Sequence, residues 1–457
     1  MDSLAFTKRG DLDVPHGSSG WGTDPVFDGH WQSALSDLLK IDTRNPLETG
    51  RLSDLTAAQE QVAELALGVG FEVAHLAPAP AESLQRSYVP KTVQDAAEQF
   101  GPEFLDSQFN LVLRIGPPQP VERTLVINWH IDTVDGCWPA SLEEGVFSGR
   151  GAVDDKGPGI AALAGVASAV RAQPELLDSM QIFVQSVAGE EGGAMGVYGT
   201  KALVDGGFVG RLNIFAEPTN GVYFNAATST MTARVDVSGE GSTDDFPGDG
   251  VNATVLLSSI CHSMARQLAG PFEGSGLKAC IGGIHTGTMH NRVYGTGSLH
   301  MNFAYADEAK ALFIESLVDE AFANALRDFE REFATTRLFA RTATRALGNC
   351  RMTWVKKGLP ALANRDSAME NILRRAGWMG CPAKNADEAF TCDAIWAQGP
   401  GRYAVVFGPG SLKTNHAHAE GEYITVGELE QYARQIAAVV REFGAHCSQS
   451  AGREEDR

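Results

Sequence analysis

The sequence predicts an α/β protein built on a mostly parallel sheet, with a second, α+β domain inserted into the first. Up to about residue 227, short apolar runs of strand length alternate with helical patterns, which is typical of a parallel sheet covered on both faces. From 228 to 356 the order changes to strand, helix, two strands and a long helix, which indicates helices packed on an antiparallel sheet. The first pattern resumes from 357 to 457, so the second domain interrupts the first.

Apolar periodicity places the elements of the first domain. Runs rich in Val, Ile, Leu and Phe predict strands, and apolar residues three or four positions apart predict helices. Strands are expected at 71–76, 109–115, 124–130, 181–186, 212–216 and 402–407, and helices around 31–39, 57–67, 159–173, 366–376 and 426–443. The stretch 77–107 between the first two strands contains aromatic residues, so we expect it to pack on the rest of the protein.

The inserted domain shows a different pattern. Residues 231–238 alternate between apolar and polar side chains, as a half-exposed strand does. Further strands are expected at 278–283 and 292–305, and helices at 252–268 and 307–333.

Composition narrows the class of protein. Of the 457 residues, 43% are hydrophobic and 21% are charged, as in globular proteins. The net charge of -20 argues against nucleic acids and anionic membranes as partners. The seven cysteines include no C-x-x-C pair, which fits reduced thiols. No apolar run has signal-peptide or membrane-spanning character. We therefore expect a cytoplasmic enzyme or binding protein that takes a small molecule.

The segment VINWHID ends an apolar strand with two polar residues, His130 and Asp132. Residues two apart in a strand point to the same face. Both side chains are therefore expected at the carboxyl end of a strand, where α/β sheets usually place their binding sites. Alone, this pattern is more typical of a polar strand end that hydrogen-bonds to its own loop than of a functional site.

Four further polar clusters follow other predicted elements. They are GRGAVDDKG (149–157), GEEGG with Glu190 and Glu191, AEPTNG with Glu217, and a C-terminal segment with His416 and His418. The first is not a phosphate-binding loop, because Gly157 rather than Ser or Thr follows Lys156. Together the clusters supply the imidazole and carboxylate donors that two adjacent divalent cations require. A further carboxylate must accept the proton of a water activated by such a pair.

These motifs, in this order, resemble the co-catalytic metallohydrolase family of aminoacylases, carboxypeptidase G and succinyl-diaminopimelate desuccinylase, over about residues 31–443. The resemblance implies a catalytic domain formed by 1–227 and 357–457, and a lid and dimerisation domain formed by 228–356. It also implies two divalent ions, zinc or alternatively manganese or cobalt, and a homodimer joined through the inserted domain. The roles that it implies are metal binding by His130, Asp154 (as the bridge), Glu191, Glu217 and His418, general base catalysis by Glu190, and orientation of His130 by Asp132.

Two family features are missing from the inserted domain. The histidine that precedes P-x-x-G-x-N-A in the family is replaced by Ser242 or Thr243, and the arginine that binds a substrate carboxylate is replaced by Ala304. Either the substrate is atypical or other groups have taken over their roles. The candidates for substrate binding are Thr243, His285, His290, Asn291 and Arg292.

Three functions remain open at this point. The first is hydrolysis of the amide of an N-acyl amino acid or small peptide-like substrate. The second is an aminohydrolase reaction on a small aromatic amine such as a nitroanthranilate. The third is a non-catalytic binding protein with the same fold, which the presence of Glu190 beside a full set of metal donors disfavours.

Overall fold

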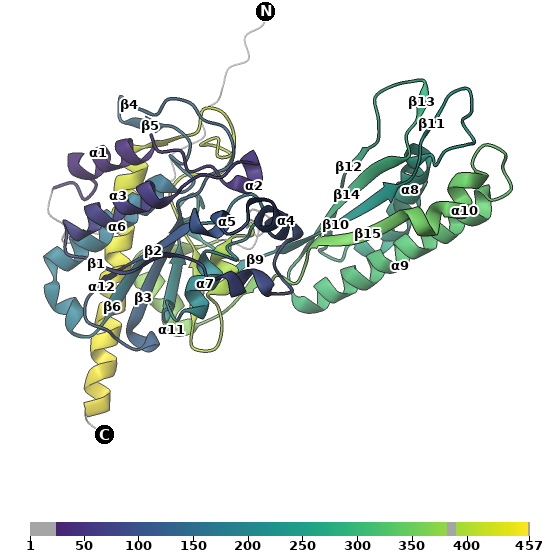
Figure 1. The fold of residues 1–457 in the computed structure, drawn as a ribbon. Helices are drawn as coiled ribbons and strands as arrows, with labels where there is room; N and C mark the ends of the chain where they lie inside the picture. Colours follow the sequence, from purple (N-terminus) through teal and green to yellow (C-terminus); the bar gives the residue numbers. More distant parts are fainter. Residues whose placement is uncertain (1–23, 382–389, 456–457) are drawn as a thin grey trace, which may run out of the picture.

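The computed structural model describes residues 24–381 and 390–455. The larger of its two bodies is built on a six-stranded sheet with the order β1–β2–β6–β3–β7–β18 (Figure 1). The strands are β1 (Glu72–Pro78), β2 (Phe109–Ile115), β3 (Thr124–His130), β6 (Gln181–Val187), β7 (Leu212–Phe215) and β18 (Tyr403–Val406). The pairings from β6 to β18 are parallel, whereas β1–β2 and β2–β6 are antiparallel. The sheet is therefore mixed.

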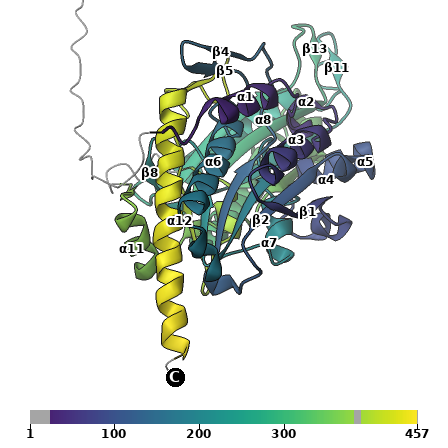
Figure 2. The ribbon, with the colours of Figure 1, turned by 90° about the vertical axis from the view of Figure 1, so that its left-hand side faces the viewer.

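Helices cover both faces of this sheet. One face carries α1 (Gly29–Leu38), α3 (Thr56–Leu67) and α6 (Lys156–Ala172), and α12 (Val426–Glu455) runs along α6 (Figure 2). Small residues let α6 approach its neighbours closely, since a side chain at Gly159 would collide with the ring of Trp129. On the other face, Leu203 of α7 (Thr200–Asp205) packs on a small apolar cluster from β2, β3 and β6. Within the described ranges, no helix combines the length and apolar character that a membrane span requires.

The smaller body has its own four-stranded antiparallel sheet, in the order β12–β14–β10–β15. Its strands and helices are β10 (Ser229–Ser238), α8 (Ala253–Phe272), β12 (Lys278–His285), β14 (Thr296–Tyr305), α9 (Glu308–Phe333), α10 (Ala340–Asn349) and β15 (Cys350–Lys356). Its buried apolar residues form a cluster that shares no member with the main core. The sequence patterns did not predict α10 or β15.

The strand expected at 292–305 is two strands, β13 (Arg292–Val293) and β14. The break falls at Gly295, whose Cα approaches the main chain of Gly239 so closely that an added methyl group would lie 2.2 Å from the Gly239 carbonyl oxygen. This close contact turns the chain away from the four-stranded sheet. As a result β13 pairs with β11 (Ser242–Thr243) at the far end of the smaller body (Figure 1).

The two bodies are joined by two neighbouring stretches of chain. On the larger body, β9 (Ala226–Ala227) pairs with β16 (Leu362–Ala363), and on the smaller body, β10 pairs with β15. The crossings are therefore Thr228 and 357–361. They lie close to the boundaries predicted at 227/228 and 356/357, and the division into domains remains a prediction.

The segment 77–107 packs on the protein, as its aromatic residues suggested. It contains α4 (Lys91–Phe100) and α5 (Glu103–Asp106), and α4 packs against β15 of the smaller body. Phe104 is fully buried with its ring 5.3 Å from that of Tyr198. The centre of the Tyr88 ring lies 5.0 Å from that of Trp396, with the two planes tilted by 47°. This segment therefore contacts both bodies.

Candidate metal centre

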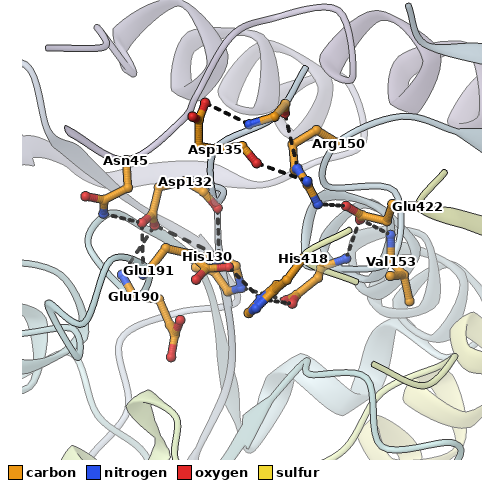
Figure 3. Close-up of polar contacts among 12 residues, drawn as sticks. Asn45, His130, Asp132, Asp135, Arg150, Val153, Glu190, Glu191, His418 and Glu422 are labelled. Carbon is orange, nitrogen blue, oxygen red and sulfur yellow. Dashed lines mark hydrogen bonds and ion pairs between the residues drawn. The ribbon is translucent and has the colours of Figure 1, made fainter. Parts of the chain in front are cut away.

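His130 ends β3 at the centre of the larger body and is fully enclosed. Its Nδ1 donates a hydrogen bond to the main-chain carbonyl of Asp132 at 2.8 Å, which fixes the ring (Figure 3). Its Nε2 lies 3.0 Å from Oδ1 of Asp154. The second ring nitrogen therefore points at a carboxylate on the loop that precedes α6.

Asp154 lies between two histidines. Its Oδ2 is 3.0 Å from Nε2 of His418, and the same nitrogen is 3.1 Å from Oε1 of Glu191. His130, Asp154 and Glu217 form one group whose donor atoms all lie within 4.8 Å of one another, and Asp154, Glu191 and His418 form another. The two groups share Asp154, so the structure brings all five predicted metal ligands together around one carboxylate.

The loop that carries Asp154 is held by a buried ion pair. Glu422 accepts hydrogen bonds from the main-chain N–H groups of Val153 (2.9 Å) and Asp154 (3.2 Å) (Figure 3). Its other oxygen lies 2.7 Å from Nη1 of Arg150, and both side chains are buried. Glu422 follows His418 by four residues, so it also links the C-terminal loop to the loop of Asp154.

Asp132 acts on the loop of the two adjacent glutamates. Its carboxylate accepts hydrogen bonds from the main-chain N–H of Glu190 (3.3 Å) and Glu191 (3.1 Å) and from Nδ2 of Asn45 (2.8 Å). The carboxylate Oδ1 is 3.9 Å from Nδ1 of His130, too far for a hydrogen bond. Asp132 thus contacts the His130 ring through its main-chain carbonyl, while its carboxylate accepts hydrogen bonds from three other donors.

Close packing fixes the shape of the same loop. Gly189 and Gly196 both have positive φ. A methyl group at Gly189 would lie 2.3 Å from the ring of Tyr198, and one at Gly196 would lie 2.2 Å from Oδ1 of Asp393. Asp393 is buried at the start of a short 3₁₀ turn that packs against this loop. The loop that carries Glu190 and Glu191 is thus held by contacts on several sides.

The cluster contains more negative charge than its own side chains can balance. The pKa of Glu190 is well above its usual value, chiefly because the residue is buried and secondly because of the negative charge of Glu191. The pKa of Glu217 is raised in the same way, by burial and by the charge of Glu190. Burial lowers the pKa of His130, but the hydrogen bond and charge of Asp154 outweigh it and raise that pKa well above the usual value. Hydrogen bonds to Asp154 and Glu191 raise the pKa of His418 to about 11. Buried carboxylates gain or share protons when no other positive charge balances them.

The residues fit two divalent cations. Imidazole nitrogens and carboxylate oxygens suit zinc and related ions, and the shared position of Asp154 suits a bridging ligand. Glu190 is absent from both groups that contain Asp154, although a third possible group combines it with His130 and Glu191. His416 is exposed, with its ring 6.0 Å from that of Tyr423, and it belongs to none of these groups.

The residues predicted to bind substrate lie elsewhere in this structure. Thr243 pairs with Arg292 between β11 and β13, which project from the smaller body away from the larger one (Figure 1). His285 ends β12, where its ring is 5.4 Å from that of His300. His290 and Asn291 are exposed on the loop before β13. Within one chain, the structure does not bring these residues to the cluster of donors.

Sequence patterns missed Asn45 and Arg150, which hold the site. Asn45 caps α2 (Pro46–Thr49) by accepting a hydrogen bond from the N–H of Leu47, and its amide reaches Asp132. The dipeptide Asn-Pro indicates only a turn or a helix start. Arg150 stands inside the GRGAVDDKG motif, but its partner Glu422 is 272 residues away in the sequence.

Comparison with known proteins identifies the family. Residues 126–442 match the family described as "Peptidase family M20/M25/M40", and this range contains all the donor residues named above. The chain belongs to this family. The M20 assignment confirms the resemblance to the two-metal hydrolases that the sequence motifs indicated.

Three M20-type proteins illustrate how similar the relatives are. A probable succinyl-diaminopimelate desuccinylase of Staphylococcus epidermidis is 31% identical over 35% of this chain, a match that spans 41% of the relative. Acetylornithine deacetylase of Myxococcus xanthus is 25% identical over 75% of this chain and 87% of its own length. The crystal structure of a tripeptidase from Staphylococcus aureus has a TM-score of 0.64 at 17% identity, over 91% of this chain and 98% of that one.

Proposed function

We propose that this protein is a hydrolase that uses two divalent metal ions and water to cleave a C–N bond, the amide of an N-acyl amino acid or small peptide-like substrate. The observation that carries the proposal is the pair of donor groups that share Asp154. The names of the relatives, a desuccinylase and a deacetylase, support an amide as the bond that is cut.

The metal ligands follow from the two groups of donors. We assign His130, Asp154 and Glu217 to one ion. We assign Asp154, Glu191 and His418 to the other. Zinc suits these donors, as do manganese and cobalt. Such ions supply an acidified water and a polarised carbonyl group.

Glu190 is our candidate for the general base. Its carboxylate is half-buried beside the two groups of donors, and burial raises its pKa, which favours a group that must hold a proton for part of a cycle. It accepts the proton of the attacking water and passes it to the nitrogen of the leaving amine. Asp132 is a positioning residue, since it holds the main chain of Glu190 and Glu191 without contacting their carboxylates.

A homodimer formed through the smaller body would account for the distant substrate residues. β12 is an edge strand of the four-stranded sheet, with Ile281 and Ile284 exposed, and such an edge can pair with its copy. We propose that a partner subunit places residues from the tip of its smaller body, Thr243, His285, His290, Asn291 and Arg292, near the substrate.

The other two candidate functions receive less support. The named relatives act on acylated amino acids, which does not favour an aromatic amine as substrate. Asp132 holds the main chain of Glu190 beside the metal donors. A protein that only binds its ligand would not need a carboxylate held at that place.

The test is a turnover screen of the zinc-, manganese- or cobalt-loaded protein with N-acyl amino acids, dipeptides and aromatic amines. We expect release of amino acid from at least one N-acyl amino acid, and loss of that activity in Glu190→Gln with metal content unchanged. Turnover of aromatic amines alone, or activity that survives Glu190→Gln, would contradict the proposal.

A further inference from the structure

The four-stranded sheet of the smaller body has one face covered by helices and one open face. Met231, Met301 and Phe303 alternate with polar residues and point into the core beneath α8 and α9. The residues between them, such as Thr232 and Asn302, therefore lie on the open face, where Thr232 Oγ1 donates to Asn302 Oδ1 at 2.9 Å. Strand register then places every other residue of the sheet on one face or the other.

Lys356 follows an irregularity in β15: the register shifts between Thr232 and Ala233, so that Lys356 rather than Val355 stands opposite Thr232 and shares its open face. The register pairs Thr232 of β10 with Asn302 of β14 on one side and with Lys356 of β15 on the other. Ala304, which stands where the family has its carboxylate-binding arginine, is two residues beyond Asn302 and so shares this face. Lys278 of the edge strand β12 pairs directly with Ala304. On its other side Ala304 pairs with Thr230 of β10, and Lys356 lies one strand further away, on β15.

The surroundings distinguish Lys356 from the other cations of the sheet. Arg234 is 2.7 Å from Asp236, and Lys357 forms an ion pair with Glu315 of α9. Among the described residues, the half-buried Lys356 ammonium forms no hydrogen bond or ion pair. Burial lowers the pKa of Lys356, and the charge that opposes this effect is that of Glu190. Lys356 ends β15 and is followed directly by the crossing 357–361 that leads to the larger body.

The main chain around Lys356 is held in place. Lys356 pairs with β10, and the next residue is tied to α9. The hydroxyl of Tyr305 donates to the carbonyl of Leu359 at 2.7 Å. Gly358, with a φ of +78°, faces Tyr88 of the 77–107 segment, since a methyl group there would lie 3.8 Å from the Tyr88 Cβ. A cation on a fixed segment loses little conformational entropy when it binds an anion.

We propose that Lys356 binds the carboxylate of the substrate, in place of the arginine that is absent at position 304. The inference rests on the proposed hydrolysis of N-acyl amino acids and adds the residue that selects their free carboxylate. The carboxylates of the site, Asp154, Glu190, Glu191 and Glu217, cannot pair with the free carboxylate of such a substrate, whereas an ammonium group can. An ammonium group provides charge without the two-pronged geometry of a guanidinium group.

The test compares ligands that differ only in the carboxylate. For the zinc-loaded full-length protein, kcat/KM is measured with N-acetyl-L-methionine and N-acetyl-L-methioninamide. Binding of L-methionine and L-methioninamide is measured by calorimetry, which requires no turnover. In Lys356→Met we expect the preference for the carboxylate over the amide to fall by about 10- to 100-fold, the usual effect of a hydrogen bond to a charged group. Lys356→Arg should keep most of that preference.

Two variants serve as matched controls. Lys357→Met removes the adjacent cation, which is paired with Glu315, and Lys278→Met removes a cation from the same face of the sheet. Both should retain the preference for the carboxylate within about threefold of the unmodified protein. The neutral amide ligands report folding, because their binding should be the same in every variant.

Each outcome decides one question. A binding preference that is lost in Lys356→Met supports the inference even if no protein in the series turns over N-acetyl-L-methionine, in which case the proposed function fails alone. The inference is overturned if the unmodified protein shows no preference, or if Lys356→Met retains it. It is also overturned if Lys278→Met loses the preference instead, or if Lys356→Met weakens acid and amide equally.

Discussion

Asp132→Asn should weaken one metal site and leave the other nearly intact. The Asp132 carboxylate accepts hydrogen bonds at 2.8, 3.1 and 3.3 Å, two of them from the main chain of Glu190 and Glu191. Hydrogen bonds to charged groups contribute about 1.5–3 kcal/mol each, and the amide of the variant would present a donor to at least one of these N–H groups. Substitution of a residue that supports metal ligands in this way typically lowers metal affinity by about 10- to 100-fold, or about 1.4–2.7 kcal/mol.

The structure predicts which site is affected. His130 is held by the main-chain carbonyl of Asp132, which the substitution does not alter, so its ion should lose less than about threefold in affinity. The ion held with Glu191 should lose about 10- to 100-fold. Metal-free protein is titrated with cobalt by calorimetry, and His130→Ala and Glu191→Ala identify the two binding steps.

Asn45→Ala is the graded control, since it removes only one of the three donors. Its effect on the same binding step should be about 0.5–1.5 kcal/mol. If Asp132→Asn weakened the step that His130→Ala removes by as much as the Glu191 step, the carboxylate would act through His130 and the reasoning would fail.

Three further predictions concern catalysis, assembly and stability. Glu190→Ala should reduce turnover by about 10²–10⁴-fold with both ions still bound, as measured by steady-state kinetics and metal analysis, and near-normal turnover would exclude it as the base. Light scattering at micromolar concentration should give the mass of a dimer, and deletion of 228–356 should leave a monomer; a monomeric full-length chain would refute the assembly. Asp366 caps α11 (Ser367–Arg375) and forms an ion pair with Arg211. Burial raises the pKa of Asp366, but the hydrogen bonds from Arg211 and from the helix N–H groups outweigh burial and hold the pKa below its usual value. Asp366→Ala should therefore lower the free energy of unfolding by about 1–2 kcal/mol at pH 7, and the difference from the unmodified protein should shrink as the pH falls below about 4. A difference that persisted unchanged at low pH would show that the charge of Asp366 contributes nothing.

Local sequence predicted the buried strands well and the half-exposed ones poorly. The strands 109–115 and 124–130 were predicted with the bounds they have in β2 and β3, because their apolar runs are bounded by polar residues. β15 was missed, because its sequence CRMTWVK places arginine, threonine and lysine on a strand whose one face is open. The metal donors could be predicted from motifs. The contacts of Asp132 could not, since its partner Asn45 is 87 residues away and only the folded chain brings them together.

The paired strands at the junction limit how the two bodies can move. β9 pairs with β16 on one side of the junction and β10 with β15 on the other, so the two crossings leave and enter neighbouring strands. A rotation of the bodies about the line through both crossings stretches neither of them. The tip formed by β11 and β13 is far from this axis and travels the longest arc. Lys356 ends β15 beside the crossing 357–361, so the same rotation moves it far less than it moves the tip.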